Sequence, residues 1–480
     1  MENRKLAGLQ PEAVFKYFEE MCAIPHGSGN TKAISDYLVD FAKAHGLRYI
    51  QDEANNVILF GDATPGYEDH APVILQGHMD MVCEKDEDCP INMDTDGLDV
   101  THDGKYVFAR GTTLGGDNGI AVAYALAILA DPTVPHPALE VIVTVDEEIG
   151  MLGADVIDLT MLKGRTLLNL DSEEEGIFTV ACAGGATATI TLPTARCPVY
   201  GPCIRLSVEG LQGGHSGVEI QKNRANAIKV MGELLRRVEK EMPLCITSLQ
   251  GGAKDNAIPR SCQVTAVMLG MHPERINEIA EKLQAEIRST YDEPEAVISG
   301  ENVEALGGNA LSQELTGKVI ALMNRIPTGV AKMSADIEGL VQTSQNIGIL
   351  RLEEGLKVTV SVRSSVNGEK LQALQALRDI AAEFEAEYEE MGDYPAWEYK
   401  EDSQLRRVMV QTYRDMFHGE PEIVAIHAGL ECGLLSEKLP GLDCVSIGPE
   451  MHDIHTSRER LGIESTARTY AFVLEILKNL

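Results

Sequence analysis

Short runs of aliphatic and β-branched residues alternate with longer runs of helical periodicity along this chain, and no other feature constrains its fold as strongly. Strand-like runs lie at 73–75, 139–145, 166–170 and 444–447, and the Ala-rich run at 119–129 has the pattern of a helix. Strands that alternate with helices are typical of an α/β domain with a largely parallel sheet. We therefore predict an α/β domain with a mixed, mainly parallel sheet.

The pattern changes after residue 186. Pairs of strand-like runs then lie among helical runs, such as those at 223–238 and 368–388, and the α/β pattern resumes near Asp402. A chain of 480 residues is longer than one hydrophobic core usually holds. The changed segment is about twice as long as one ferredoxin-like β-α-β-β-α-β unit, which suggests an inserted α+β domain with two copies of one motif. The predicted division is 1–186 for the first part of the α/β domain, 187–398 for the inserted domain and 399–480 for the second part.

The formal net charge of −33 argues against the usual partners of a basic protein. Nucleic acid and anionic membrane surfaces attract positive charge, so we expect neither as a partner. The longest apolar run, 119–130, is far shorter than the roughly 20 residues that span a bilayer, and no secretory signal is expected because the N-terminus lacks an apolar run. We expect a cytoplasmic protein, either a monomer or a homodimer.

Histidine and acidic residues directly follow four of the predicted strands. These residues are His78 with Asp80, Glu147 with Glu148, Asp171, and His455. A further acidic residue, Asp117, lies in Gly-Gly-Asp-Asn-Gly at the start of the helix at 119–129. In open α/β sheets, ligands bind beyond the carboxyl ends of the strands. We therefore expect these side chains to converge on one site.

The residue types in this set suit a pair of divalent cations. Imidazole and carboxylate ligands bind zinc, manganese or cobalt, and the chain lacks the paired cysteines of a structural zinc site. Two cations about 3.5–4 Å apart share a bridging carboxylate and take further protein ligands each. The set matches this count, with Asp117 as the bridge and His78, Asp171, Glu148 and His455 as the further ligands. We expect two divalent ions per chain, with zinc as the first choice and cobalt or manganese as alternatives.

Two carboxylates remain after the metal ligands are assigned. Glu147 is adjacent to the proposed ligand Glu148, and adjacent side chains on extended backbone point in different directions. Glu147 could take a proton from water and pass it to the leaving amine. Asp80 lies two residues after His78 and could orient its imidazole through the second ring nitrogen. Taken singly, these motifs are more often solvated loops or helix caps, so the prediction depends on their occurring together in this order.

In this order, the segments resemble the di-zinc aminoacylase and carboxypeptidase family. The family pattern is His-x-Asp, Gly-Asp-Asn, Glu-Glu, Asp and a late His, and the chain has all five. The resemblance implies a zinc-peptidase-type catalytic domain with an inserted lid, Glu147 as the general base and a cis peptide bond after Asp117. The ligand sets that it implies are His78, Asp117 and Asp171 for one zinc, and Asp117, Glu148 and His455 for the other.

Within this family, the chain is similar to the bacterial aminoacyl-histidine dipeptidases, also called Xaa-His dipeptidases or carnosinases. The motifs that carry this similarity lie at 77–85, 111–119, 213–217, 255–260 and 426–433. The similarity implies a small peptide substrate of the Xaa-His type, such as carnosine.

The last metal ligand is where the sequence departs from the family pattern. The family usually has His-Ser-Pro-x-Glu, whereas this chain has His455-Thr-Ser-Arg-Glu459. His452 lies close by, but the spacing to Glu459 favours His455 as the ligand.

Further candidates for substrate binding lie in the inserted domain and after it. His215 is in a Gly-flanked loop, and similar lids place a histidine there, which implies a donor to the oxyanion; an exposed turn histidine is the alternative. Arg363 ends a strand and could clamp the terminal carboxylate of a substrate, or form a structural ion pair. Asn256 could help to bind that carboxylate or the oxyanion, and Glu431 could bind the amino terminus.

Other functions remain open from the sequence. A broader di- or tripeptidase and an acylamino-acid deacylase would use the same site. A metal-dependent peptide-binding protein without catalytic activity belongs to another class, and the presence of Glu147 argues against it.

Overall fold

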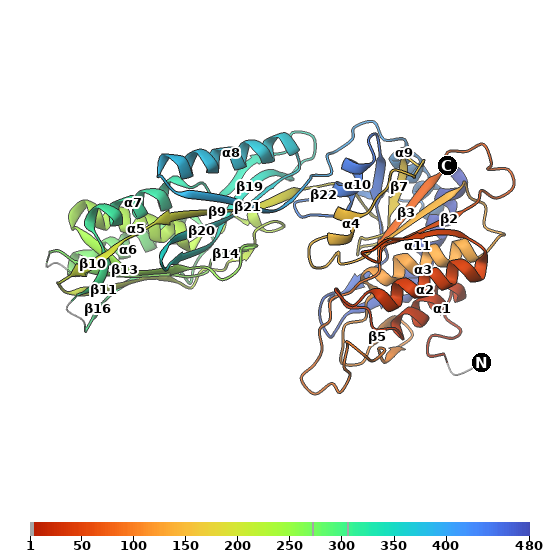
Figure 1. Ribbon diagram of the computed structural model, residues 1–480, viewed down its shortest axis with the longest axis horizontal. Helices are drawn as coiled ribbons and strands as arrows, with labels where there is room; N and C mark the ends of the chain where they lie inside the picture. Colours follow the sequence, from red (N-terminus) through yellow and green to blue (C-terminus); the bar gives the residue numbers. More distant parts are fainter. Residues whose placement is uncertain (1–3, 271–272, 305–306) are drawn as a thin grey trace. The chain divides into compact units, whose positions relative to one another are not determined.

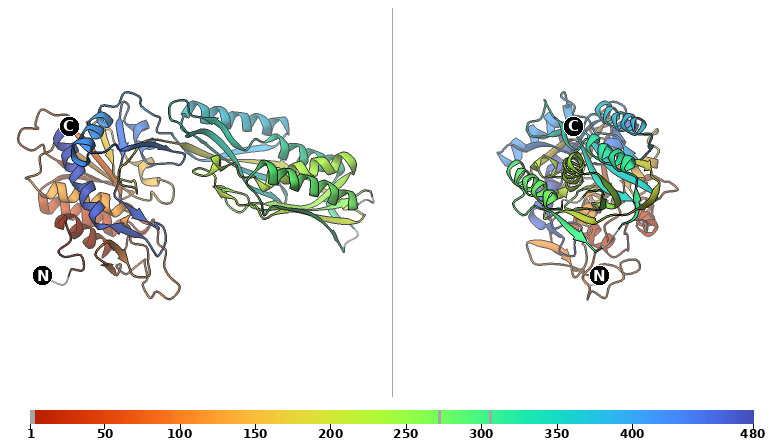
Figure 2. Two further views of the ribbon diagram at one scale, coloured as in Figure 1. Left: turned by 180° about the vertical axis from the view of Figure 1, so that it is seen from behind. Right: turned by 90° about the vertical axis from the view of Figure 1, so that its left-hand side faces the viewer.

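The computed structural model describes residues 4–270, 273–304 and 307–480, which form two compact units. The first unit comprises the residues up to Ala181 together with 399–425 and 430–480, and the second comprises 182–398 together with 426–429. In Figures 1 and 2, the first unit is drawn mainly in red, orange and blue, and the second in yellow to cyan apart from its blue segment 426–429. The division that the sequence suggested, at 187 and 398, stays a prediction.

The first unit is built on an eight-stranded mixed sheet. Its strands, in spatial order, are β1 (Arg48–Gln51), β2 (Val57–Gly61), β6 (Leu139–Thr144), β3 (Val73–His78), β7 (Thr166–Asn169), β23 (Asp443–Ser446), β8 (Ile177–Cys182) and β22 (Glu422–Ile426). The four central strands β6, β3, β7 and β23 run parallel, whereas β1, β2 and β8 pair antiparallel. The expectation of a mixed, mainly parallel sheet is confirmed, and its parallel part consists of the four central strands.

One helix of this unit, α3 (Gly116–Ala130), is buried almost all round. Each residue from Asn118 to Ile128 is buried, which explains why the segment is rich in alanine rather than amphipathic. The helix packs between α1 and β3. The other helices of the unit are α1 (Glu12–Cys22), α2 (Lys32–His45), α4 (Leu152–Val156), α9 (Gln404–Phe417), α10 (Cys432–Lys438) and α11 (Ile463–Asn479).

A small four-stranded sheet lies beside the start of α3. Its strands, in spatial order, are β24 (Met451–His452), β25 (Arg460–Gly462), β5 (Tyr106–Ala109) and β4 (Val100–His102). It joins two segments that are more than 300 residues apart in the chain, because Leu461 pairs with Val107.

The second unit consists of two ferredoxin-like motifs that share one sheet. The first motif has the order β-α-β-β-α-β and the spatial strand order β16-β11-β15-β13. Its elements are β11 (Cys203–Glu209), α5 (Ala227–Glu241), β13 (Leu244–Gly251), β15 (Cys262–Met268), α6 (Pro273–Thr290) and β16 (Val297–Val303).

The second motif repeats this arrangement around the first. Its spatial strand order is β19-β20-β9-β21, and the first motif is inserted between its first strand and its first helix. Its elements are β9 (Gly184–Pro193), α7 (Gln313–Arg325), β19 (Val341–Leu352), β20 (Gly355–Ser364), α8 (Asn367–Glu383) and β21 (Glu387–Tyr394). The motifs join where Gln250 of β13 pairs with Arg351 of β19, and both share one apolar core. The expectation of ferredoxin-like units is confirmed.

Short strands complete the second unit. β18 (Gly329–Met333) pairs with β19 outside the main order, and two strand pairs stand apart from the main sheet. These pairs are β10 (Arg196–Val199) with β17 (Gly308–Leu311), and β12 (Gly214–His215) with β14 (Ala257–Ile258). A 3-10 turn, η1 (Ile220–Lys222), lies between β12 and α5.

Two predicted helix boundaries in this unit are wrong. The helix predicted at 368–388 ends at Glu383, because the chain turns at Glu385 with a positive φ of 53° and continues as β21. The helix predicted at 223–238 begins at Ala227, because the side chain of Asn226 accepts hydrogen bonds from the backbone amides of Ile228 and Lys229. Across the described ranges, none of the helices is long and apolar enough to cross a membrane.

Candidate active site

The five proposed metal ligands lie at or next to the ends of helices and strands in the first unit. His78 is the last residue of β3, and Asp171 follows β7, its neighbour in the sheet. Glu148 follows β6, the other neighbour of β3. Because these three strands are parallel, their carboxyl ends lie at one edge of the sheet. Asp117 begins α3, and His455 lies between β24 and β25.

Asp117 is at the centre of this group. Its Oδ1 lies 3.2 Å from Nε2 of His78, and its Oδ2 lies 3.1 Å from Nε2 of His455. Nε2 of His78 is also 3.4 Å from Oδ1 of Asp171, and Nε2 of His455 is 2.9 Å from Oε1 of Glu148. The structure therefore brings all five proposed ligands together, with one oxygen of Asp117 facing each imidazole.

The charges of this site fit a divalent cation. Ligand atoms of His78, Asp117 and Glu148 lie within 4.8 Å of one another. The ion-pair partners of the carboxylates at this site are the imidazoles of His78 and His455. Among the described residues, no lysine or arginine pairs with Asp80, Asp117, Glu148 or Asp171. Buried carboxylates in excess of their counter-charges are the usual setting of a metal ion.

Burial and neighbouring charges shift the pKa values of Asp171 and Asp117 in opposite directions. Burial raises the pKa of Asp171 to about 6, with the negative charges of Asp117 and Glu148 adding to it and His78 opposing. Burial also raises the pKa of Asp117, but the hydrogen bonds to His455 and His78 outweigh it, so that this pKa lies below its usual range.

The turn that presents Asp117 is fixed by a residue that the sequence did not single out for this role. The carboxylate of Glu459 accepts hydrogen bonds from the backbone amides of Leu114 (2.7 Å), Gly115 (3.1 Å) and Gly116 (2.8 Å). The peptide bond between Asp117 and Asn118 is cis, as the family resemblance implied. The position of Glu459 four residues after His455 in the family pattern was the available signal.

Asp80 holds the loop of the Glu-Glu pair. Its carboxylate accepts the backbone amide of Glu147 at 3.1 Å and the hydroxyl of Ser28 at 2.8 Å. Nδ1 of His78 lies 3.0 Å from the backbone carbonyl of Asp80 and 3.4 Å from its carboxylate. Asp80 therefore contacts both the imidazole that it was expected to orient and the backbone of the proposed general base.

Glu147 lies close enough to the proposed ligands for its charge to interact with theirs. Burial raises its pKa well above the ordinary value, the positive charge of His78 opposes this, and Asp171 and Glu431 raise it further. A carboxylate in such a setting has the raised basicity that proton transfer needs.

Glu431, which was expected from the sequence to bind an amino terminus, lies in the first unit. Its side chain is completely buried in the first unit. Its Oε2 accepts hydrogen bonds from Nε2 of Gln76 (2.5 Å) and the hydroxyl of Thr144 (2.7 Å), which lie on β3 and β6. Its Oε1 makes no hydrogen bond among the described residues, so the contact with an amino terminus stays a prediction.

His452 lies apart from the ligand group. Its Nε2 lies 3.5 Å from Glu450, and its ring packs edge-on against Tyr106. The contacts of His455 with Asp117 and Glu148 support the choice of His455.

The second unit groups the proposed substrate-binding residues. Nδ1 of His215 accepts the backbone amides of Gly217 (3.1 Å) and Val218 (3.2 Å), which leaves the proton on Nε2 as a donor. Burial and then the charge of Arg363 lower the pKa of His215, so its imidazole is neutral. The carbonyl of Asn256 accepts the amide of Ser216 and ties the two loops together at 2.9 Å.

Arg363 has no carboxylate partner among the described residues. Its Nη1 donates to the hydroxyl of Tyr394 at 3.0 Å, and its Nε is buried without a hydrogen-bond partner. This arrangement argues against the structural ion pair and leaves a cation available for an anionic ligand.

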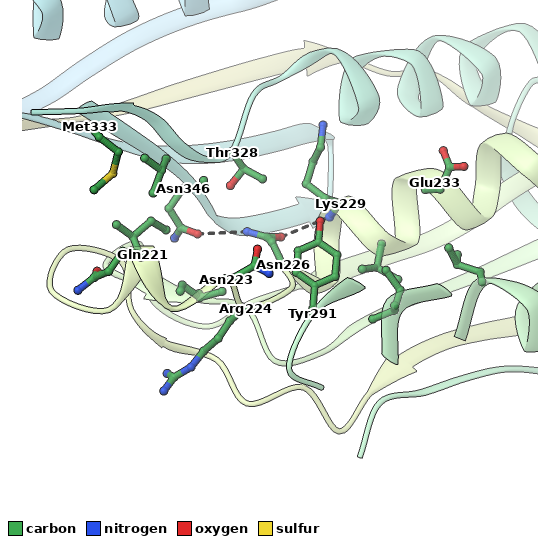
Figure 3. Close-up of a pocket in the computed structure, with 17 residues that line it drawn as sticks. Gln221, Asn223, Arg224, Asn226, Lys229, Glu233, Tyr291, Thr328, Met333 and Asn346 are labelled. Carbon is green, nitrogen blue, oxygen red and sulfur yellow. Dashed lines mark hydrogen bonds between the residues drawn. The ribbon is translucent and has the colours of Figure 1, made fainter. Parts of the chain in front are cut away.

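A separate cavity of about 600 Å³ lies in the second unit between α5, α6 and β18 (Figure 3). Two of its polar side chains are already paired. The ammonium of Lys229 donates to the carbonyls of Met323, Asn324 and Ile326. The amide of Asn226 donates to Asn346, as the dashed line in Figure 3 shows. This cavity does not include His215 or Arg363, and the sequence had not indicated it.

Comparison with known proteins places the chain in a family. Residues 74–479 match the model of Peptidase family M20/M25/M40. The chain is 34% identical over 484 residues to the cytosol non-specific dipeptidase of Escherichia coli (strain K12), covering 99% of each. It also matches the crystal structure of aminoacylhistidine dipeptidase from Vibrio alginolyticus with 35% identity and a TM-score of 0.92, covering 99% of this chain and 98% of that one.

A more distant structure shares only the fold. Aminopeptidase PepT from Bacillus cereus is 16% identical, with a TM-score of 0.57 over 98% of this chain and 99% of that chain. The family resemblance that the motifs indicated is confirmed by the full-length match. The protein belongs to peptidase family M20/M25/M40.

Proposed function

We propose that this peptidase is a cytoplasmic dipeptidase that holds two zinc ions and hydrolyses dipeptides of the Xaa-His type. The observation that carries the proposal is the position of Asp117, whose two carboxylate oxygens each face a different imidazole. The relatives support the substrate class, since one is named a cytosol non-specific dipeptidase and the other an aminoacylhistidine dipeptidase. The first of these names also favours a second candidate, a dipeptidase with broader specificity.

The proposed ligands divide into two sets that share Asp117. His78 and Asp171 would complete one set, and Glu148 and His455 the other. Such a pair of cations polarises a scissile carbonyl and lowers the pKa of water when bound. Cobalt or manganese would suit the same ligands.

The protein's own residues would carry the proton. Glu147, whose pKa is raised by burial, takes a proton from the attacking water and returns it to the leaving nitrogen. Asp80 positions Glu147 through its backbone amide and His78 through its imidazole.

Four further residues are proposed to recognise the rest of the substrate. His215 donates from Nε2 to the developing oxyanion, because its Nδ1 is already occupied as an acceptor. Arg363 binds the terminal carboxylate of the peptide, with Asn256 assisting at the carboxylate or the oxyanion. Glu431 binds the amino terminus of the peptide through Oε1, which has no hydrogen-bond partner among the described residues, while Gln76 and Thr144 hold its Oε2.

The proposed partner is a small peptide substrate. Nucleic acid and membrane surfaces are not expected as partners, because the net charge is −33. Whether the chain acts as a monomer or a homodimer stays a prediction for a sizing experiment.

The test is a substrate panel with zinc-loaded protein. Carnosine, Ala-His, Ala-Leu, Gly-Gly-Gly and N-acetyl amino acids would be compared by kcat/KM. Preferential hydrolysis of Ala-His and carnosine is expected, and similar values for Ala-Leu would favour the broader dipeptidase. Hydrolysis of the N-acetyl amino acids alone, or of none of the compounds by protein with bound zinc, would refute the dipeptidase.

A further inference from the structure

The short segment 426–429 belongs to the second unit although the residues on both sides of it belong to the first. The backbone amide of Ala183 donates to the carbonyls of Ile426 (3.1 Å) and Ala428 (3.0 Å). On its other side, the segment touches the loop of His215: a Cβ at Gly217 would lie 2.4 Å from the carbonyl oxygen of His427. The backbone at His427 is therefore fixed next to a proposed substrate-binding loop.

The imidazole of His427 is buried, and one of its two nitrogens makes a hydrogen bond. It is 5% exposed, and its Nε2 lies 2.7 Å from the hydroxyl of Ser344. Ser344 is the direct cross-strand partner of Arg363 in the pairing of β19 with β20. Side chains directly opposite each other on antiparallel strands lie on the same face, with their Cβ atoms about 4.5–5.5 Å apart. His427 is thus held beside the guanidinium group of Arg363.

The surroundings of His427 keep its imidazole neutral. Burial lowers its pKa to about 3, and the charge of Arg363 adds to this effect, while the carbonyl of Val341 opposes it. A neutral imidazole has one donor and one acceptor nitrogen. If the hydroxyl of Ser344 donates to Nε2, the proton is on Nδ1.

Two buried donors at this place then remain without a hydrogen bond of normal distance and angle. Among the described residues, this holds for Nδ1 of His427 and Nε of Arg363, although the backbone carbonyl of Val341 is an acceptor close to the imidazole of His427. Buried polar groups are normally paired, so unpaired donors beside a cation without a counter-ion indicate a missing anionic acceptor.

We propose that His427 is a substrate-binding residue, which donates a hydrogen bond from Nδ1 to the terminal carboxylate of the peptide beside Arg363. This proposal rests on the proposed dipeptidase function. It extends the carboxylate subsite by a residue whose role the sequence motifs did not suggest. The subsite would favour peptides with a free terminal carboxylate. An amidated terminus has no negative charge and only one acceptor oxygen, so it would leave a buried donor without an acceptor.

The test separates the two nitrogens of the ring. The amide nitrogen of asparagine can replace Nδ1 as a donor, whereas that of glutamine replaces Nε2. In His427→Gln, we expect KM for Ala-His to rise about ten-fold or more while kcat changes little, since a hydrogen bond to a charged group is lost. His427→Asn should restore most of the affinity. His70→Gln, which replaces an exposed imidazole of the first unit, is the control and should leave both constants unchanged.

Two kinetic outcomes would contradict the role of His427 in substrate binding. An equal rise in KM for the Gln and Asn variants, or a fall in kcat without a change in KM, would mean that His427 only supports the fold. Circular dichroism of each variant checks that it is folded.

A binding measurement decides the question without turnover. In ¹⁵N-histidine-labelled protein carrying Glu147→Gln, saturating Ala-His should shift the Nδ1 signal of His427 and slow the exchange of its proton, whereas Ala-His amide should not. An unchanged signal with bound Ala-His would overturn the proposal. If the wild-type protein hydrolyses no dipeptide, the proposed function fails, and this binding experiment still tests His427.

Discussion

The carboxylate of Asp80 holds the backbone of Glu147, whose amide donates to Oδ1 across 3.1 Å. The same carboxylate lies 3.4 Å from Nδ1 of His78. Asp80 is 1% exposed, so neither contact is shared with solvent. One buried side chain thus links a proposed metal ligand on β3 to the proposed general base after β6.

Replacing Asp80 should therefore impair metal binding and turnover together. For Asp80→Ala we expect zinc affinity and kcat each to fall about 10- to 100-fold, the usual effect of losing an outer partner of a metal-bound histidine. Chelator competition and steady-state kinetics measure the two quantities. Asp69→Ala, at an exposed position of the same unit, is the control. Unchanged zinc affinity in Asp80→Ala would disprove the link.

Replacing Glu147 should separate catalysis from metal binding. Glu147→Gln keeps the shape of the side chain but cannot accept a proton, so kcat should fall roughly 10²- to 10⁴-fold. Zinc content, measured by mass spectrometry of the purified variant, should stay at the wild-type value. Substantial residual turnover would remove Glu147 from proton transfer.

Glu459 should matter for both stability and metal content, because its carboxylate accepts three backbone amides of the turn before Asp117. Glu459→Gln replaces a charged acceptor with a neutral one, at a cost of about 1.5–3 kcal/mol in the free energy of unfolding. Thermal unfolding and zinc content should both decrease. Glu464→Gln, at the exposed start of α11, should change neither by much. A Glu459 variant with wild-type stability would contradict the structural role of this carboxylate.

The sequence was a good guide to residues whose role depends on strand ends. His78, Glu148 and Asp171 follow parallel neighbours in the sheet, so locating the strands was enough to predict that they meet. Contacts that depend on long-range packing were not predicted. Neither the hydrogen bonds of Glu431 with Gln76 and Thr144 nor the assignment of His427 to the second unit has a local sequence pattern.

Helix boundaries show the same limit. Apolar periodicity continues past Glu383 in the sequence, but a positive φ at Glu385 ends the helix and begins an antiparallel strand. The sequence also could not show the order in which strands of the ferredoxin-like motifs pair, since that order depends on contacts across the whole sheet.

Lys229 provides a test of the second unit by pH. Burial lowers its pKa from 10.5 to about 8. Below pH 8, both the folded and the unfolded chain carry this proton. Between about pH 8 and 10.5, the unfolded chain binds more of it than the folded chain, so the contribution of Lys229 to stability rises with pH.

The variant Lys229→Met should lack this rise. It should also be less stable throughout, because the carbonyls of Met323, Asn324 and Ile326 lose their donor. The difference in melting temperature between the wild type and the variant, measured at pH 7, 8, 9 and 10, should widen above pH 8. A constant difference would mean that the lysine keeps its ordinary pKa.

The most direct measurement of the shared metal site is anomalous diffraction from crystals of the zinc-loaded protein. Two zinc peaks about 3.5–4 Å apart are expected on either side of Asp117, one near His78 and Asp171 and the other near Glu148 and His455. A single peak, or zinc bound only away from Asp117, would contradict the two-metal site.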